Sequence, residues 1–420
     1  MTSPLLTLLL QITVTLVVAG AFSVLARRVG EPAVVGEMVA GIFLGPTVLG
    51  ALLPRFHAYV FAPASLAPLR LFGEIGVVVF MFCVGLRTSG ETIRRNRTAA
   101  LLVSHASIVA PFALGIGTAW LLYPRYAGAS TPFLTFALFI GVAMSITAFP
   151  VLARILADRD WTHTNVGTVA LTCAAIDDVT AWCLLAVITA IAQWQHQVRA
   201  VVVTLASIAL FTLILFKVVK PLVARLRSRF VAPTIIAIAA AALTEAIGVH
   251  SMFGAFIAGV SSPLEGDERN ALADRLSGMN HILLPLFFAY TGLRTNLRIF
   301  ADARTLAIAA AIIAVATLGK LGASTFVSRL LGTSWRDSLF IGALMNTRGL
   351  VELVVLNVGY DLGIVSAPMF SIMVVMALAT TLATTPLLGL IARHPERSEG
   401  SACVDGTNRV DPAPTAQVPR

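Results

Sequence analysis

Apolar runs of about 17 to 25 residues follow one another along almost the whole chain, with short polar connections between them. About 20 apolar residues in a helix cross the hydrocarbon core of a bilayer. A segment in lipid must satisfy its backbone polar groups internally, so these runs are restricted to helices. Of the 420 residues, 57% are hydrophobic and 12% are charged, which excludes a soluble globule. The sequence therefore predicts an all-α polytopic membrane protein.

The runs give about thirteen candidate transmembrane helices. Their centres lie near residues 15, 43, 78, 110, 144, 178, 210, 240, 257, 285, 315, 346 and 378. The stretch 235–263 is too long for one span, and we divide it at 248–250. We expect a transmembrane domain over 1–393. Residues 394–420, rich in Pro, Ser, Gly and charge, are expected to form a disordered cytoplasmic tail.

The basic residues in the connections set the orientation of these spans. Cytoplasmic loops carry the excess of Lys and Arg. With the N-terminus outside, the connections on the cytoplasmic side hold 18 basic residues and those on the other side hold 7. We therefore expect a multi-pass protein of the cell membrane with its N-terminus outside and its C-terminus in the cytoplasm.

Four short motifs occur twice in the same order. GEMVAG at 36–41 is echoed by GAFIAG at 254–259, GLRT at 85–88 by 292–295, RT at 97–98 by 304–305, and LFIGVAM at 138–144 by LFIGALM at 339–345. Each motif moves by seven spans, an odd number, so the second copy is inverted in the membrane. We expect a first repeat over about 4–192, a linker helix over about 198–222 and a second repeat over about 231–391. Inverted repeats of this kind build secondary transporters.

Asp177 and Asp178 are adjacent in a run from Val166 to Ala192 that holds no other charge. A carboxylate at the centre of a membrane helix costs roughly 2.5 to 3.5 kcal/mol on the lenient insertion scale. The pair therefore predicts a cation or proton site within the membrane.

The fifth and twelfth spans carry signs of a broken helix. The fifth span contains Ser145 and, five residues later, Pro150. A proline inside a helix frees backbone carbonyls. In the twelfth, Asn346 and Arg348 precede Gly349, which permits an unwound turn. Half-helices that cross expose charged ends, and an ionic partner is expected beside them.

The ionic groups available for the crossing lie on the twelfth and eleventh spans. Arg348 and Glu352 are four residues apart, and the alternative for them is a buried structural pair. Lys320 lies well inside the eleventh span, where it needs an anion, and Asp177 or Asp178 can supply one. Snorkelling to a helix end is the alternative for this lysine. We expect the two adjacent aspartates, with such a lysine beside them, to titrate as a coupled pair.

Several classes of protein are disfavoured. The four cysteines have no paired spacing and no histidine partners, so we expect neither a disulfide frame nor a zinc site, and no cofactor. The net charge of +9 is spread between apolar runs, so nucleic acid is not an expected partner. An intramembrane aspartyl protease needs its two aspartates on separate helices. We therefore expect a transporter without catalytic residues.

The chain resembles the monovalent cation/proton antiporters with the NhaA-like fold, a branch with sodium and potassium antiporters of bacteria and plant cation/proton exchangers. The resemblance covers about 4–391 and rests most on the motifs at 36–46, 145–156, 175–182 and 344–357. It implies that Asp178 binds the cation and the proton, that Asp177 pairs with Lys320, and that Thr147 is a ligand at the helix crossing. It also implies a homodimer whose core domain slides past a fixed domain. Ala148 departs from the Asp of some sodium-selective members.

The residues and the resemblance together predict an antiporter that exchanges Na⁺ or K⁺ for H⁺ by alternating access. Asp178 would be the site of the transported cation. A sodium-coupled symporter of organic solutes on the same fold is the alternative, and it would need a roomy polar cavity beside the crossing. Weaker candidates for a cation funnel are Glu37, Glu74 and Glu245. His250 is a weaker candidate for a pH sensor.

Overall fold

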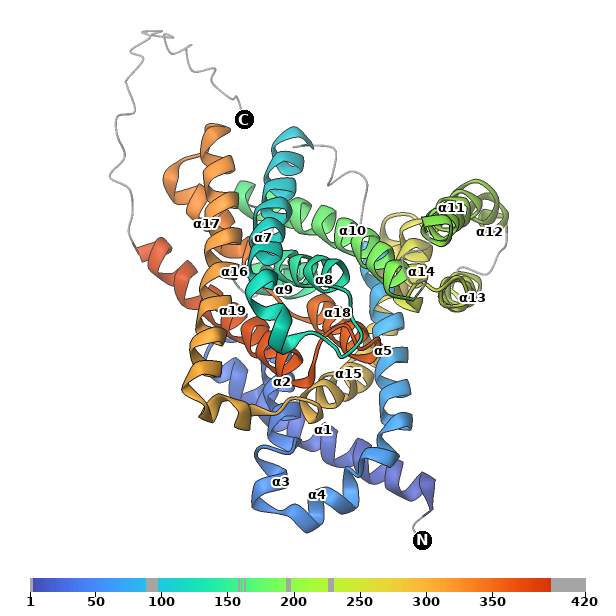
Figure 1. Cartoon of the computed structure of the whole chain (residues 1–420). Coiled ribbons are helices and arrows are strands. Elements are labelled where there is room, and N and C mark those ends of the chain that lie inside the picture. The colour runs from blue at the N-terminus through green and yellow to red at the C-terminus, as the bar shows by residue number, and fades with distance from the viewer. Residues whose placement is uncertain are drawn as a thin grey trace, which may run out of the picture.

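The computed structural model describes residues 3–87, 97–157, 159, 161, 164–193, 198–225 and 230–393. Within these residues the fold is helical, and its one β-type contact is an isolated bridge between Ala127 and Val365. The tail expected over 394–420 lies outside the described residues, as do several of the basic connections, including Arg94 and Arg227. Figure 1 shows the N-terminal helices at the lower end of the molecule, with α11, α12 and α13 standing to one side.

The first half of the chain forms helices up to α10. They are α1 (Pro4–Arg28), α2 (Ala33–Leu44), α3 (Leu49–Leu52), α4 (Pro54–Val60), η1 (Pro63–Ser65), α5 (Leu66–Arg87), α7 (Arg97–Tyr126), α8 (Phe133–Ser145), α9 (Phe149–Ala157) and α10 (Asn165–Gln193). The long ones are apolar on most sides, as membrane helices are. The short α3 and α4 connect α2 to α5.

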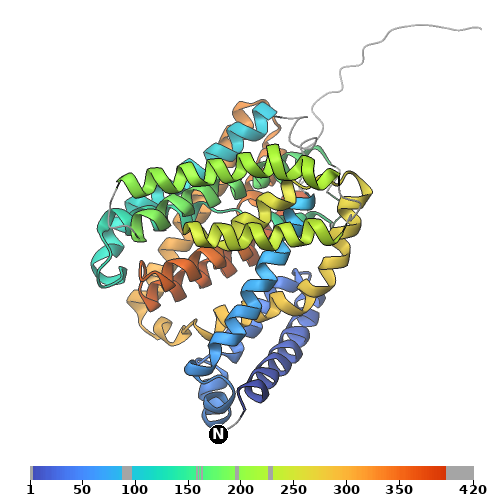
Figure 2. The ribbon, with the colours of Figure 1, turned by 90° about the vertical axis from the view of Figure 1, so that its right-hand side faces the viewer.

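The second half begins with a linker. The helices of this half are α11 (Val198–Ile214), the π-helical η2 (Leu215–Val219), α12 (Lys220–Ala224), α13 (Val231–Ile247), α14 (Ser251–Val260), α15 (Asp267–Leu293), η3 (Leu297–Ala301), α16 (Ala303–Leu330), α17 (Trp335–Met345), α18 (Leu350–Asp361) and α19 (Ala367–Arg393). Only 18% of the apolar window in the α11–α12 segment is buried. In Figure 2, α11 and α13 run side by side across the face toward the viewer.

All thirteen predicted centres fall in or next to a helix. Among the described residues, eight helices are long and apolar enough to cross a membrane, or nine if α17 and α18, bent by 40°, form one span. The apolar helices α8, α13 and α14 are shorter. An all-helical membrane fold is therefore found, while the number of thirteen spans stays a prediction.

The division of 235–263 into two helices is confirmed. Helix α13 ends at Ile247, and Gly248 follows in the left-handed conformation with φ of 89°. Helix α14 then begins at Ser251. Glycine adopts this conformation without steric penalty, so it ends the helix at the predicted place.

The repeated glycine motifs make reciprocal helix contacts. A Cβ at Gly41 in α2 would lie 2.4 Å from the backbone oxygen of Phe288 in α15. A Cβ at Gly259 in α14 would likewise lie 2.4 Å from the backbone oxygen of Phe82 in α5. Each repeat thus presses its small-residue helix onto a long helix of the other repeat. Close approach of this kind is how helices associate in lipid.

Candidate functional site: a crossing of two broken helices

Two broken helices meet near the centre of the molecule. The first break separates α8 from α9 and the second separates α17 from α18. The two breaks contact each other directly, because the Ala148 backbone amide donates a hydrogen bond of 2.9 Å to the Thr347 carbonyl. At Gly349 the two broken helices are so close that a Cβ would lie 2.7 Å from Cγ2 of Val151. The predicted crossing is present.

The first break has a different cause from the one expected for Pro150. Helix α8 ends at Ser145, Ile146 is extended, and α9 starts at Phe149. Pro150 is therefore the second residue of α9, in the first turn, where an intrahelical hydrogen-bond donor is not needed. The proline favours the start of the second half-helix instead of freeing carbonyls inside a continuous one. The open carbonyls belong to the end of α8.

Two buried cations occupy the carbonyl end of α8. The guanidinium of Arg348 donates hydrogen bonds of 2.8 Å to the Ala143 carbonyl and 2.6 Å to the Met144 carbonyl. The ammonium of Lys320, in α16, donates to the Ser145 carbonyl. Positive charge at a helix C-terminus is stabilising because it satisfies open carbonyls and opposes the helix dipole. Lys320 is thus buried and hydrogen-bonded, without snorkelling.

Arg348 also has an anion beside it. Its Nη1 lies 3.3 Å from Oε2 of Glu352 in α18, and both side chains are fully buried. Thr381 in α19 fixes the backbone of Arg348, accepting from its amide at 3.1 Å and donating to its carbonyl at 2.8 Å. The pair that the sequence placed beside the crossing therefore joins α8, α18 and α19.

Asp177, in α10, is held by four groups. Oδ1 accepts a hydrogen bond of 2.5 Å from Ser104, and Oδ2 accepts 2.8 Å from Ser107 and 2.7 Å from Thr147. Lys320 Nζ lies 3.4 Å from Oδ2. The hydroxyl of Thr147 is also 3.2 Å from the Met345 carbonyl. A carboxylate with so many donors is stabilised in its charged form and in one orientation.

Asp178 has the opposite environment. It is 1% exposed, and neither of its carboxylate oxygens has a hydrogen-bond partner of good geometry among the described residues. The Phe149 backbone amide, at the start of α9, interacts with it electrostatically. Adjacent residues on a helix point about 100° apart, and this difference in direction separates a saturated carboxylate from an open one.

The second break carries further open polar groups. Both side-chain polar atoms of Asn346 and the hydroxyl of Thr347 are buried without a partner in the described part of the chain. Buried polar groups in proteins are almost always hydrogen-bonded, so unpartnered ones mark a place for a ligand or water. They lie on the chain segment whose Thr347 carbonyl accepts a hydrogen bond from the Ala148 amide, and Ala148 directly precedes Phe149.

A cavity of about 780 Å³ lies between α5, α13, α15 and α18. Glu74 and Glu245 line it together with Arg70, His250 and Asp361. Its carboxylates outnumber its arginine, which favours cations. Of the three glutamates considered for a cation funnel, Glu37 is not among the lining residues.

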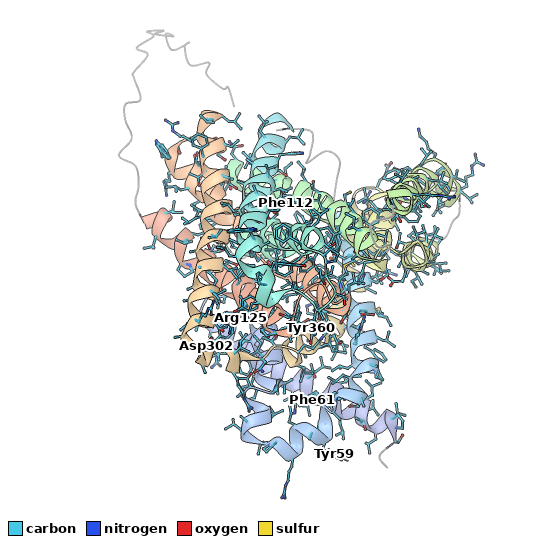
Figure 3. The ribbon with its side chains drawn as sticks, viewed as in Figure 1. Tyr59, Phe61, Phe112, Arg125, Asp302 and Tyr360 are labelled. Carbon is cyan, nitrogen blue, oxygen red and sulfur yellow. The ribbon has the colours of Figure 1, made fainter. Side chains whose placement is uncertain are left out.

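An ion-pair network borders this cavity. Asp361, the last residue of α18, lies 3.3 Å from Arg70 of α5 and 2.5 Å from Arg294 at the end of α15. The guanidinium of Arg294 also lies 4.3 Å from the ring centroid of Tyr360, which stacks on Phe370. Tyr360 is labelled in Figure 3. The network ties the second half-helix of the crossing to two helices outside it.

The sequence reasoning missed the hydroxyls that hold Asp177. Ser104 and Ser107 are fully buried in α7, some 70 residues before the aspartate. Their spacing of three residues places them on one face of a helix, which is a visible signal. Serines in apolar spans are common, however, and often bond to their own helix backbone. Nothing local distinguishes this pair from such serines.

The fold and the site are those of a membrane transporter. The sodium/hydrogen exchanger transmembrane family matches residues 13–393. The chain belongs to this family, which consists of transporters and not of enzymes. The structure of the sodium proton antiporter MjNhaP1 from Methanocaldococcus jannaschii superposes with a TM-score of 0.69 at 14% identity, over 93% of this chain and 99% of that one.

Relatives at higher identity come from several kingdoms. The Na(+)/H(+) antiporter NhaS4 of Synechocystis is 40% identical over 92% of this chain and 97% of its own length. Cation/H(+) antiporter 17 of Arabidopsis thaliana is 39% identical over 96% of this chain, and K(+)/H(+) antiporter 1 of Saccharomyces cerevisiae is 32% identical over 93%. The chain spans 51% of the plant protein and 47% of the yeast protein.

Proposed function

We propose that this protein is a secondary antiporter that exchanges Na⁺ or K⁺ for H⁺ at Asp178. The observation that carries the proposal is the inequality of the two aspartates. Asp177 has three hydroxyl donors and an ammonium, whereas Asp178 is buried with both oxygens open. A buried carboxylate without partners is costly unless a proton or a cation neutralises it. Competition of the two ions for one carboxylate couples their movements.

The cation site would be completed from the crossing. Asn346 and Thr347 offer a side-chain carbonyl and a hydroxyl that have no other partner among the described residues. Oxygen ligands of this kind suit hard cations. Thr147 donates its proton to Asp177 but keeps oxygen lone pairs, so it remains a proposed ligand beside Asp178. The positions of Lys320 and Arg348 at the end of α8 neutralise the carbonyls that would otherwise compete for the cation.

The ion-pair network supports alternating access by sliding. Helix α18 belongs to the broken pair that carries the site, and its last residue, Asp361, is bound to Arg70 and Arg294 from α5 and α15. Movement of the crossing relative to α5 and α15 requires these contacts to break and re-form. The large cavity on this boundary would serve as the route of the cation between solvent and the crossing.

The orientation in the membrane is proposed from the cavity and the basic connections, and the assembly from the family. The connections assigned to the outer face meet at one end of the fold, since Arg70, His250 and Asp361 line one cavity. This supports the alternation of the spans, and the basic residues give its direction. We accordingly propose a cell-membrane protein with its N-terminus outside and a homodimeric assembly, which mass measurement in detergent would test.

A symporter of organic solutes is less well supported. It would need a roomy polar cavity beside the crossing, and the large cavity has mainly apolar side chains. Neither Asp178 nor Asn346 lines it. The open polar groups at the crossing fit a small ion better than a larger solute.

Everted vesicles with an imposed pH gradient test the function. Addition of Na⁺, K⁺ or Li⁺ should collapse the gradient in vesicles with the wild-type protein. Asp178→Asn should abolish the response, while Asp274→Asn, which alters an exposed ion pair with Arg87, should leave it unchanged. Normal exchange by Asp178→Asn would refute the assignment of this residue.

A further inference from the structure

Helix α16 carries two buried serines on the same face as Lys320. Ser324 and Ser328 follow the lysine at intervals of four residues, which keeps all three on one side of the helix. Ser324 is 0% exposed and Ser328 is 1% exposed. Neither hydroxyl has a hydrogen-bond partner among the described residues.

Thr15, Thr135 and Thr325 are also buried without a partner in the described part of the chain, but many other buried hydroxyls are bonded. Several buried hydroxyls donate to the carbonyl four residues before them, as Thr291 does at 3.0 Å and Thr384 at 3.0 Å. Such back-bonding is the ordinary state of a hydroxyl in an apolar helix. Ser324 and Ser328 do not adopt it. A buried polar group that is left unpaired costs about 1–3 kcal/mol, so these two hydroxyls require another partner.

A small cavity lies at the far end of this face. It has a volume of about 90 Å³ and is lined by residues of α7, α10, α16 and α17 and of the connection between α16 and α17. Ser328 lines it together with Asn165, Thr333 and Asp337. A water molecule occupies about 30 Å³ in the liquid, so the cavity holds a few waters. The four polar side chains among its nine lining residues can give them hydrogen-bond partners.

The face leads from this cavity to the ion pair at the crossing. Successive positions four residues apart are about 6 Å apart along a helix, a distance that one water bridges between two hydroxyls. Beyond Ser324 the next polar group is Lys320, which contacts the Ser107 carbonyl and Asp177. The hydroxyls of Ser104 and Ser107 continue the series to both oxygens of Asp177.

The smaller cavity is separate from the one assigned to the cation. No residue lines both, and α10 is the one helix that contributes residues to both walls, Thr189 to the larger cavity and Asn165, Val166 and Val169 to the smaller. The larger cavity lies on the boundary with α5, α13 and α15, whereas the smaller one is inside the bundle that carries the crossing.

We propose that Ser328 and Ser324 form a water-filled proton route from the membrane face where α16 ends to the Lys320–Asp177 pair, apart from the path of the cation. Each hydroxyl accepts one hydrogen bond and donates one, so a proton that enters as hydronium is relayed without change in the net charge of the serines. The route ends at the Lys320–Asp177 ion pair, and Asp177 directly precedes Asp178 in α10. By the proposed orientation it opens to the cytoplasm. This inference rests on the proposed antiport.

The test compares two modes of transport in proteoliposomes. Cation/proton exchange needs the proton route, whereas exchange of labelled cation for unlabelled cation at constant pH does not. Ser324→Val and Ser328→Val fill the route with methyl groups, and Ser324→Ala removes one hydroxyl with less change in volume. Thr384→Val is the matched control, because its hydroxyl is buried and back-bonded.

The Val variants should lower cation/proton exchange at least about tenfold, within the range that positioned proton-transfer groups contribute. Their rate of cation/cation exchange should stay within about twofold of the wild-type rate, which is well below a tenfold change. Thr384→Val should leave both modes unchanged. Equal loss of both modes, or loss of neither, would overturn the proton route. Absence of both modes in the wild-type protein would instead refute the antiport itself.

Access of water provides a second readout. In a protein whose native cysteines are replaced by serine, Ser324→Cys and Ser328→Cys should react with a small charged methanethiosulfonate reagent. Thr384→Cys should not react. The route is overturned if both introduced thiols stay unreactive in a protein that still exchanges cation for cation.

Discussion

Replacement of Lys320 tests how the buried charges at the crossing stabilise one another. The ammonium is fully buried and donates to the Ser107 and Ser145 carbonyls, with Asp177 Oδ2 at 3.4 Å. Lys320→Met keeps the length of the side chain and removes the charge. Asp177 then retains three hydroxyl donors but no cation.

The magnitude follows from the burial of the pair. Removal of one partner from a buried ion pair costs about 3–5 kcal/mol because the other charge stays uncompensated. Asp177→Asn alone should cost about 1.5–3 kcal/mol, the value of hydrogen bonds to a charged group. The double variant leaves no charge uncompensated, so it should be more stable than Lys320→Met alone. The coupling energy should be about 2 kcal/mol or more.

Thermal unfolding of the purified protein in one detergent measures this coupling. At about 2 °C per kcal/mol for a large domain, Lys320→Met should lower the midpoint by about 6–10 °C. The double variant should recover several degrees of that loss. Strict additivity of the two single changes would refute the argument that the ammonium compensates Asp177. The control is the corresponding set of single and double substitutions at the exposed Arg87–Asp274 ion pair, which should show almost no coupling.

Three further results are expected. Gly349→Ala should lower the free energy of unfolding by about 1–3 kcal/mol, because the new Cβ would lie 2.7 Å from Val151. Val151→Ala in the same protein should restore part of that free energy. An unchanged unfolding midpoint would show that the crossing is looser than described. Burial raises the pKa of Glu31, between α1 and α2, to about 7, so its native state prefers the protonated form and stability should fall as the pH rises from about 4.5 to 7. Glu31→Gln should flatten this part of the pH profile of the unfolding midpoint, and an unaltered profile would assign it to other groups. A short bismaleimide that joins Arg70→Cys to Asp361→Cys in a protein without other cysteines should stop exchange if α18 slides past α5, while a linked protein that still exchanges would contradict sliding at this boundary.

Some features of this protein depend only on the order of residues along the chain. The lengths of the apolar runs, the duplicated glycine motifs and the charges inside spans depend only on order in the sequence, and they predicted the helices, the repeat and the crossing. Pro150 shows the limit of such reasoning, because the same residue breaks a helix from within or starts a new one. Only the position of the neighbouring carbonyls distinguishes the two.

The sequence by itself determined that this protein is a helical membrane transporter with two carboxylates that need a use. It named Lys320 and Arg348 as the buried cations, since lipid makes an isolated charge expensive wherever it stands. The tertiary structure decided which aspartate is open. That depends on Ser104 and Ser107, which come from another helix about 70 residues away. Hydrogen bonds form between side chains that meet in space, and the facing of two helices is fixed by the packing of the whole bundle.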